Sequence, residues 1–320
     1  MKAVICDRYG APESLRLVEL PDPEAGPDEI LIRVACSTVN RTDTATLRAH
    51  PFFARAMTGW LRPRHRVTGM DFAGVVAAVG ARVTRFAEGD RVFGMTSESF
   101  GAHAELLVMP QSGAVAQIPD GISTDAAVIC EGAWYASSTT APLRGGQSIL
   151  VYGATGAIGT AAVQLARASG AEVTAVTGTG DVALARDLGA AHVLDYQTQD
   201  FTKIDARFDV VFDAVGKTSY FACRKLLKPG GKFRATDLGP WWSNIWLGLW
   251  FSLTGAHRVS VPFPEDGPGF PAMLAGLMQA GHIRGVFDRR YRLEEIVAAF
   301  EFVETGTKTG IVRVDIGDIG

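Results

Sequence analysis

The sequence has no long apolar run, no run of basic residues and no closely spaced cysteines. No segment reaches the roughly 18 uninterrupted apolar residues that a membrane-spanning helix needs, so we expect no membrane span. The formal net charge is -3 and the lysines and arginines are scattered, which predicts no nucleic-acid partner. The four cysteines show no CxxC spacing, which is typical of reduced thiols in a cytoplasmic protein.

Internal repeats and low-complexity segments are also absent from the 320 residues. This length suggests about two domains, and 47% hydrophobic residues are enough to fill their cores. The first residues read as a strand, and they lack the long apolar stretch of a secretory signal peptide. The segment Trp241–Phe251 holds four of the six tryptophans but is too short to span a membrane. It predicts a buried helix or a pocket wall, and the alternative is a contact with a membrane surface or another subunit.

The first 115 or so residues are rich in strand signals. Turn-forming residues, including Pro21–Pro27 and Glu88–Asp90, separate the runs. This spacing predicts a small β-barrel rather than βαβ units. The expected strands are Ala3–Cys6, Glu29–Cys36, Gly74–Val79, Arg91–Phe93 and Ala104–Val108.

From about Ile122 strand and helix signals alternate, which predicts a parallel sheet with helices on both faces. We expect strands at 148–152, 172–177, 192–194, 208–213 and 232–235, with helices at 157–168, 182–188 and 219–227. Lys228–Gly231 is the turn between the last helix and strand of this set. The final stretch predicts helices near Phe270–Ala280 and Glu294–Glu304, and strands near Val286–Tyr291 and Ile311–Val314.

The most informative motif is the glycine-rich turn Gly153–Gly159, between an expected strand and an expected helix. Gly156 would let the backbone approach a pyrophosphate, and Gly159 would let the helix pack close to its strand. The helix start would aim N–H groups and the positive end of its dipole at the phosphates. This context predicts a dinucleotide-binding α/β unit; the alternative is a glycine-rich loop with no ligand.

The order of short motifs along the chain resembles the medium-chain dehydrogenase/reductases, on the zinc-free quinone oxidoreductase-like branch that includes zeta-crystallin. The markers are Val39–Asp43, Gly69–Val76, Gly89–Gly94, Gly101–Glu105, Gly153–Gly159, Leu188–Tyr196, Phe208–Gly216 and Lys228–Gly231. The resemblance implies a GroES-like β-barrel catalytic domain, residues 1–117 completed by 262–320, and a doubly wound Rossmann domain, residues 118–261. It also implies hydride transfer to or from a nicotinamide, and a homodimer.

The zinc-bearing members of that superfamily place a cysteine and a histidine–glutamate pair where this chain has Asn40, Met70 and Asp71. Neutral asparagine and methionine are poor zinc ligands, so we expect no metal. The alternative is a zinc ion held by Cys36 and Asp43.

The expected second strand of the nucleotide-binding unit ends at Thr177 and Gly178, without the acid that commonly holds the ribose of NAD. An unopposed acid there would favour NADH, and its absence favours NADPH. No lysine or arginine occurs from 177 to 185 to hold a phosphate. The first acid, Asp181, most simply caps the next helix. Tyr196 falls where the relatives contact the adenosine phosphate, and the alternative is a half-exposed strand tyrosine.

Asn40 matches the family asparagine near the nicotinamide and is our candidate hydrogen-bond donor to a substrate oxygen. The alternative is an asparagine that completes a turn. Asp43 would cap a helix beginning at Thr44, or orient Asn40 or Arg48. Ligands of open α/β sheets bind at the carboxyl ends of the strands. The candidate cofactor-binding residues are Gly153, Ala154, Thr155, Gly156, Ala157, Ile158, Thr177, Gly178, Tyr196, Val215, Leu238 and Phe263.

These features together predict an NADPH-dependent reductase that transfers hydride to a quinone or a conjugated carbonyl compound without metal. Phe52–Leu61 and Trp241–Phe251 would wall an apolar substrate pocket. One alternative is a metal-free alcohol or carbonyl oxidoreductase on the same scaffold. A second is a nucleotide-binding protein without turnover, because a fold alone does not establish a reaction.

Overall fold

The computed structural model describes residues 1–52, 55–97, 99–255, 258–261 and 267–317. The chain forms two compact units: unit 1 is Met1–Glu131 with Asp266–Gly320, and unit 2 is Gly132–Glu265. The predicted domain boundaries, after 117 and after 261, came from the resemblance and stay predictions.

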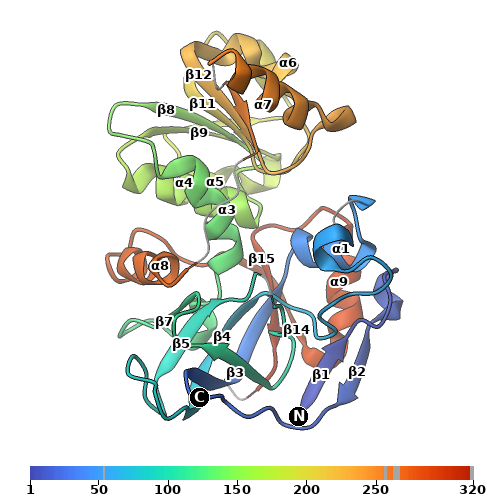
Figure 1. Cartoon of the computed structure of the whole chain (residues 1–320). Coiled ribbons are helices and arrows are strands. Elements are labelled where there is room, and N and C mark those ends of the chain that lie inside the picture. The colour runs from blue at the N-terminus through green and yellow to red at the C-terminus, as the bar shows by residue number, and fades with distance from the viewer. Residues whose placement is uncertain (53–54, 98, 256–257, 262–266, 318–320) are drawn as a thin grey trace. The chain divides into compact units, whose positions relative to one another are not determined.

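Unit 1 is built on a seven-stranded sheet in which every pairing but one is antiparallel (Figure 1). Its order is β14 (Phe287–Arg292), β15 (Ile311–Asp315), β3 (Glu29–Val39), β4 (Asp71–Val79), β5 (Arg91–Met95) and β7 (Val115–Gln117), and β6 (Leu106–Pro110) also pairs with β3. A separate hairpin joins β1 (Lys2–Ile5) to β2 (Arg16–Glu19). The five strands predicted before residue 115 are confirmed. The short strands β2 and β7 were missed.

The last strand of the chain belongs to the sheet of unit 1, because β15 pairs antiparallel with β3. Helix α9 (Ile296–Glu304) covers this pair, and its Phe300 and Val303 are buried in one cluster with Val312 and Val314. Unit 1 also contains α1 (Arg41–Arg48), α2 (Arg55–Thr58) and α8 (Gly269–Gln279). The helices and strands predicted after residue 267 are confirmed.

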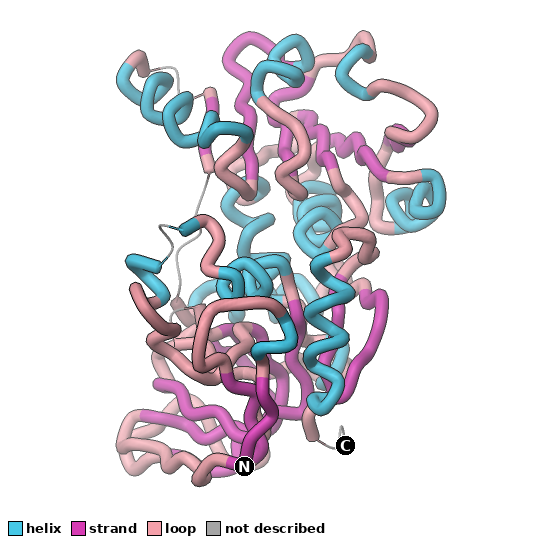
Figure 2. The backbone as a smooth tube through the Cα atoms, turned by 90° about the vertical axis from the view of Figure 1, so that its right-hand side faces the viewer, coloured by secondary structure: helices cyan, strands magenta, loops and turns pink. Residues whose placement is uncertain are grey.

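Unit 2 is a six-stranded parallel sheet flanked by helices (Figure 2). The order is β10 (His192–Asp195), β9 (Glu172–Thr177), β8 (Ser148–Tyr152), β11 (Phe208–Asp213), β12 (Leu227–Ala235) and β13 (Val259–Ser260). Within this unit α4 (Ala157–Ala168) and α5 (Val182–Asp187) lie on one face, with α6 (Tyr220–Cys223) and α7 (Ser243–Leu253) on the other. The predicted doubly wound α/β arrangement is confirmed.

Two predictions of local structure in this region were wrong. The helix expected at 219–227 is only α6 followed by a 3-10 turn, Arg224–Leu226, and β12 already begins at Leu227. Pro229 disfavours helical backbone at the residue before it, so Lys228 is extended and the expected turn at Lys228–Gly231 lies inside β12. Helix α3 (Cys130–Thr140) was missed, because its buried residues do not fall on one helical stripe.

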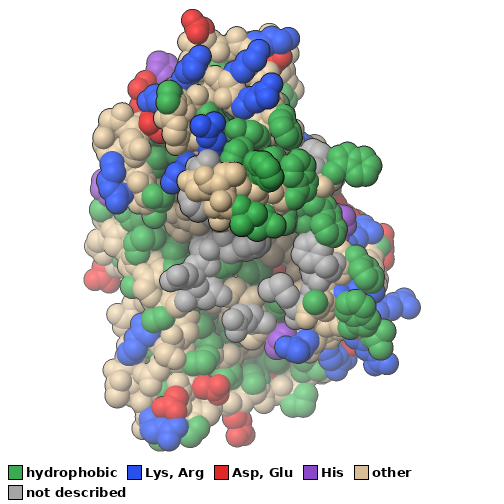
Figure 3. All heavy atoms as spheres, turned by 45° about the horizontal axis from the view of Figure 1, so that its top comes forward, with side chains coloured by type: hydrophobic (Ala, Val, Ile, Leu, Met, Phe, Trp, Pro, Cys, Tyr) green, Lys and Arg blue, Asp and Glu red, His purple; other side chains and the backbone are tan. Residues whose placement is uncertain are grey.

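The aromatic segment forms a helix, but the expectation that it is buried was wrong. Asn244 and Leu247 of α7 point inward and are buried, and Phe251 packs against the core of unit 2. Other large side chains of the segment point outward: Trp241 is 94% exposed and Trp250 is 62% exposed. Figure 3 shows hydrophobic side chains gathered over this region. The exposed residues of this α7 face are Trp241, Trp242, Ile245, Trp246, Leu249, Trp250 and Leu253.

Candidate active site

The predicted asparagine and aspartate meet at the start of α1, where Asn40 is the N-cap. The helix begins at Arg41, so Asp43 is its third residue and not the cap that the sequence predicted. The backbone N–H of Asn40 donates to Asp43 Oδ2 over 2.8 Å, as a carboxylate at this position commonly accepts. Arg48 instead pairs with Glu304 (2.7 and 2.6 Å). Asp43 therefore orients the backbone of Asn40.

The Asn40 side chain is buried, and part of its hydrogen-bonding capacity is used within the protein. Its Nδ2 donates to Thr38 Oγ1 over 2.8 Å, and the Thr38 hydroxyl lies 3.4 Å from Asp71 Oδ2. An amide nitrogen carries two hydrogens, so one remains beyond the bond to Thr38. Among the described residues nothing bonds Asn40 Oδ1. A buried amide with spare capacity is suited to hold a substrate oxygen.

Three carboxyl groups lie buried beside this helix start. The backbone N–H of Glu131 donates to both oxygens of Asp71 (2.9 and 3.0 Å), and the Thr42 hydroxyl donates to Glu131 Oε1 over 2.6 Å. Burial raises the pKa of Asp43 to about 8 and, more strongly than any other cause, raises the pKa values of Asp71 and Glu131. The charge of Glu131 adds to the first two shifts. Burial therefore favours the neutral form of all three carboxyl groups.

Sequence reasoning missed Glu131. Its signal was an acid inside an otherwise small and apolar segment, Ala126–Trp134. Such an acid is rarely fully buried without a partner. Lys308 acts on it from the segment before β15, and burial lowers the pKa of that lysine to about 8.

The donors at the zinc-equivalent positions do not suit a metal. Asn40 and Asp71 are engaged as described above, and Met70 offers only a thioether. The Cys36 thiol lies 3.9 Å from the Thr124 carbonyl oxygen, and burial raises its pKa to about 12. No group of three histidine, cysteine or acidic side chains within the described ranges could hold a metal ion.

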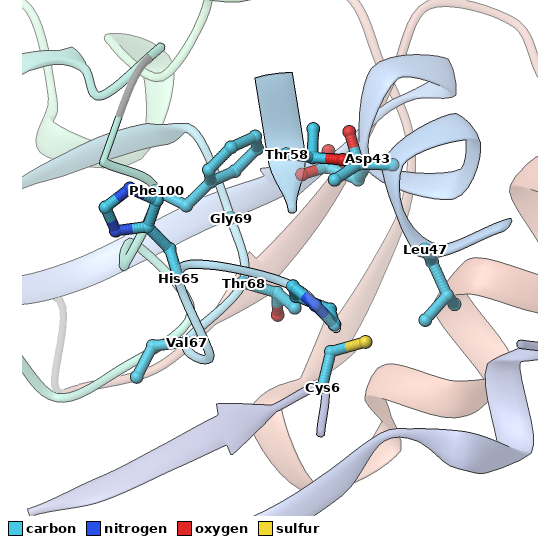
Figure 4. Close-up of a pocket in the computed structure, with 11 residues that line it drawn as sticks. Cys6, Asp43, Leu47, Thr58, His65, Val67, Thr68, Gly69 and Phe100 are labelled. Carbon is cyan, nitrogen blue, oxygen red and sulfur yellow. The ribbon is translucent and has the colours of Figure 1, made fainter. Parts of the chain in front are cut away.

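A small pocket lies beside Asp43, which forms part of its wall (Figure 4). The space that water-sized molecules can occupy is about 30 Å³, enough for a water molecule or a small substituent. Asp43 Oδ1 is buried and has no hydrogen-bond partner among the described residues. The walls are mainly apolar: Cys6, Thr46, Leu47, Thr58, Pro63, His65, Val67, Thr68, Gly69 and Phe100 join Asp43 there.

The predicted pocket walls are only partly found. Thr58 lines this pocket, but Phe52, Trp60 and Leu61 of the same insert are exposed, and 53–54 lie outside the described residues. The tryptophans of α7 line neither this pocket nor the hollow beside β13, to which Ile245 and Gly248 contribute.

The glycine-rich turn of unit 2 has the geometry of a phosphate cradle. Gly153 has a positive φ of 77°, and a Cβ there would lie 2.4 Å from Val215. A Cβ on Gly159 would lie 2.0 Å from the Gly153 carbonyl oxygen, so this glycine serves close packing. Gly156 is the N-cap of α4, and a Cβ there would meet only the Gly153 oxygen, at 3.6 Å. That open side fits a phosphate against the helix N-terminus. Ala154 and Thr155 complete the turn, and Ala157 and Ile158 are the first residues of α4.

Side chains converge at the carboxyl end of β9 in a way the sequence did not predict. The Thr155 hydroxyl lies 2.7 Å from that of Thr177 and donates to Asp181 Oδ2 over 3.0 Å. Asp181 occupies the N-cap position of α5, but its carboxylate does not cap that helix. Asp195 lies opposite Thr177 in the sheet and accepts from the Thr179 hydroxyl over 2.6 Å.

The remaining cofactor candidates lie at the same edge of the sheet or outside the described residues. Tyr196 is half exposed, and a Cβ on Gly178 would lie 3.3 Å from its hydroxyl. Val215 follows β11, where its N–H donates to Asp213 Oδ1 over 3.1 Å. Leu238 lies in the loop between β12 and α7, and Phe263 is not among the described residues.

Comparison with known proteins gives matches over both units. Residues 26–120 match the alcohol dehydrogenase GroES-like domain, and residues 188–312 match a zinc-binding dehydrogenase domain. A quinone oxidoreductase of Pseudomonas aeruginosa is 31% identical over 94% of this chain and 95% of its own length. The chain belongs to the medium-chain dehydrogenase/reductases, on their quinone oxidoreductase-like branch.

Further reductases and oxidoreductases are similar to the chain over most of its length. A 2-methylene-furan-3-one reductase of Solanum lycopersicum is 30% identical over 98% of this chain and 79% of its own length. The structure of the quinone oxidoreductase from Coxiella burnetii aligns with a TM-score of 0.83 over 99% of each chain, at 25% identity. The chain also matches a mycocerosic acid synthase-like polyketide synthase of Mycobacterium tuberculosis, but spans only 12% of its length. By this membership the protein is an NAD(P)H-dependent oxidoreductase.

No helix in the described part of the chain is long and apolar enough to cross a membrane. The four cysteines are free and buried.

Proposed function

We propose that this protein reduces a quinone or a conjugated carbonyl compound with hydride from a nicotinamide, without a metal. The observation that carries the proposal is the buried cluster of carboxyl groups at the start of α1, where the zinc-bearing members place metal ligands. Hydride addition to an enone leaves an enolate oxygen, which needs hydrogen-bond donors or a proton rather than a Lewis acid. The printed names of the quinone oxidoreductase and furanone reductase relatives support this substrate class.

The residues have distinct roles in this reaction. A bound dinucleotide supplies the hydride, and the backbone at Gly156 would hold its pyrophosphate. The free hydrogen of the Asn40 amide would donate to the substrate oxygen as negative charge develops there. Asp43 holds the backbone of Asn40 and so fixes the direction of that amide. The apolar pocket beside Asp43 would take a small substituent of the substrate.

The preferred cofactor we propose is NADH. The sequence favoured NADPH because no acid ends β9 at Thr177. The bonds of Thr155 bring the Asp181 carboxylate to that strand end, and Asp195 lies beside it. A carboxylate there can accept hydrogen bonds from ribose hydroxyls and repels a 2′-phosphate. The same rule that favoured NADPH from the sequence therefore supports NADH once these side chains are placed, and NADPH is the alternative.

The exposed α7 face supports the proposal that the protein is a homodimer. Large apolar side chains in contiguous exposed positions commonly mark an interface. Helix α7 packs against β13, a two-residue strand that ends the sheet order among the described residues, and such edge strands commonly pair with another chain. The cytoplasm stays the predicted location.

The direct test is nicotinamide oxidation by chelator-treated protein with an ortho-quinone and with a simple enone. Turnover that survives chelation supports the metal-free reductase. Oxidation of an alcohol, with neither acceptor reduced, would favour the alcohol oxidoreductase. Dinucleotide binding with no turnover on a wide panel would favour the non-catalytic alternative.

Asn40→Ala tests the proposed donor. We expect kcat to fall by about 100-fold, the usual effect of losing one oxyanion donor, while the dinucleotide Kd stays unchanged. Stopped-flow single turnovers and fluorescence titration measure the two quantities. Equal kinetics in the variant and the wild type would reduce Asn40 to a helix cap.

The cofactor proposal is tested by Asp181→Asn, whose side chain can still accept from Thr155. We expect kcat/KM for NADPH to rise about tenfold relative to NADH, because a like charge near the phosphate is removed. Asp205→Asn is the matched control, since this exposed acid precedes β11 at the opposite end of the strand. A wild-type enzyme that prefers NADPH, and that the substitution leaves unchanged, would contradict the proposal.

A further inference from the structure

Glu131 makes a contact that no step described above uses. The Thr42 hydroxyl donates to its Oε1 over 2.6 Å, a short hydrogen bond between α1 and the start of α3. Glu131 is only 2% exposed, whereas Thr42 is half-buried. The pair therefore links a fully buried acid to the hydroxyl of a half-buried residue.

The position of Thr42 places its hydroxyl near the proposed substrate site. Thr42 is the second residue of α1 and follows the N-cap, Asn40, by two positions. The first turn of a helix is held in place by its cap and its backbone, so the hydroxyl has a fixed location near the amide proposed to hold the substrate oxygen.

The charges around Glu131 suit an acid that gives up a proton and takes it back. Burial raises its pKa, while the Thr42 hydroxyl and the charge of Lys308 lower it. Asp43 and Asp71 face it as further buried carboxyl groups. Lys308 is in turn influenced by Asp288 and Arg41. Burial favours the neutral acid, and the nearby ammonium limits the cost of the carboxylate once it forms.

We propose that Glu131 is the proton reservoir of the reduction and acts through the Thr42 hydroxyl. This inference rests on the proposed function. Hydride forms the new C–H bond at the β-carbon, and the electron pair of the C=C bond moves to leave an enolate oxygen. The Thr42 O–H bond breaks as its proton passes to that oxygen, and Thr42 takes the proton of the Glu131 carboxyl group. The resulting carboxylate lies near Lys308 and regains a proton from water, so each turnover consumes one proton.

Infrared difference spectroscopy tests the protonation state without any turnover. The wild type at neutral pH should show the carbonyl stretch of a protonated carboxylic acid that Glu131→Gln removes. Thr42→Val should shift this band, since it deletes the hydrogen bond and keeps the side-chain shape. An ionised Glu131 at neutral pH, or a band that Thr42→Val leaves in place, would overturn the proposal even if the enzyme is an active reductase.

Kinetics test the proton path. Thr42→Val and Glu131→Gln should each lower kcat by about 100-fold, within the usual range for general acid catalysis, with an unchanged dinucleotide Kd. Glu131→Gln should also remove the solvent isotope effect and the dependence of kcat on the ionisation of Glu131, and Thr42→Ser should restore most of kcat. Thr44→Val is the matched control, because the Thr44 hydroxyl donates to a backbone carbonyl, that of Arg41, at 3.0 Å and to no side chain within the described part of the chain.

Failure of the proposed function and failure of the proton reservoir would give different experimental results. If no acceptor is reduced by the wild type, the proposed function fails and the infrared bands alone decide whether Glu131 holds a proton shared with Thr42. If acceptors are reduced but both variants retain the wild-type kcat and solvent isotope effect, the reservoir is wrong and the reductase stands. Thermal unfolding of each variant identifies any loss that comes from misfolding.

Discussion

At the scale of single residues, the start of α1 shows what a motif can and cannot predict. Asn40 and Asp43 stood out in the sequence because they match family positions, and the structure brings both to one helix start. The helix boundary was placed three residues late, since Asp43 read as a cap rather than as the acid that accepts from the cap backbone. The contact of Glu131 with Thr42 could not be read from the sequence pattern, because it forms only through tertiary packing. The roles of all three stay proposals.

The buried carboxyl of Asp43 predicts a pH-dependent stability. Its pKa is raised from 3.8 to about 8 in the folded protein, so between these values the folded state holds a proton that the unfolded state has lost. The free energy of unfolding therefore falls as pH rises from about 4 to 8, by at most about 1.4 kcal/mol per pH unit for this one group. Asp43→Asn should flatten this slope, and denaturant titrations at pH 5 and pH 8 measure it.

A second buried group, His103, provides a control for this pH dependence of stability. His103 lies between the Thr68 hydroxyl and the Thr38 carbonyl, and burial lowers its pKa to about 4. A lowered histidine pKa adds stability as pH rises from about 4 to 6.5, the opposite sign. His103→Gln should therefore alter the slope only below pH 6.5. Equal slopes for Asp43→Asn and the wild type would contradict the raised pKa of Asp43.

At the scale of elements, the hydrophobic pattern predicted bounds most accurately where all side chains of a strand or helix lie in one kind of environment. The buried parallel strands β8, β9 and β11 match their predicted bounds, because continuous apolar runs bounded by turn residues have few other interpretations. The segment 219–227 was read as one helix, although Pro229 stands only two residues beyond its predicted end. The side-chain cluster at the end of β9 could not be predicted, since Thr155, Thr177 and Asp181 are joined by the fold and not by spacing.

The turn before α4 gives a prediction at this scale. Gly156→Val should abolish dinucleotide binding, because the branched side chain would occupy the open side of the turn. The fold should survive, since φ is -75° and a Cβ there meets no protein atom closer than 3.6 Å. Calorimetry with NADH measures the Kd. Gly276→Val in α8, where a Cβ would also meet open space, is the control for an added side chain. An unchanged Kd in Gly156→Val would contradict the cradle.

At the scale of the whole molecule, each unit has its own sheet and its own core, and the fold class followed from the sequence. The alternation of strand and helix signals predicted the parallel sheet, and the resemblance predicted that the tail joins the first domain. Exposure was predicted less well. The tryptophan-rich segment was expected inside, but Asn244, Leu247 and Phe251 fill the inward positions of α7 and leave the larger rings outside.

The α7 face predicts the oligomeric state. Trp246→Glu with Trp250→Glu should convert a dimer into a monomer of 34.1 kDa, since charges would be buried in an apolar contact. Light scattering after gel filtration measures the mass. Met273→Glu, on the partly exposed surface of α8, is the control and should leave the dimer intact. A wild type that is already monomeric at micromolar concentration would contradict the proposal, and binding to lipid vesicles would then favour the membrane surface.

The pairing of β15 with β3 sets an order on synthesis at the ribosome. Every residue of unit 2 is made before β15 exists, so one edge of β3 stays without its partner while unit 2 acquires all the strands of its own sheet. Domains fold largely as units during synthesis, and long-range strand pairing is slow. The nascent chain can therefore complete the nucleotide-binding sheet first, and the sheet that supports Asn40 and Asp43 closes last.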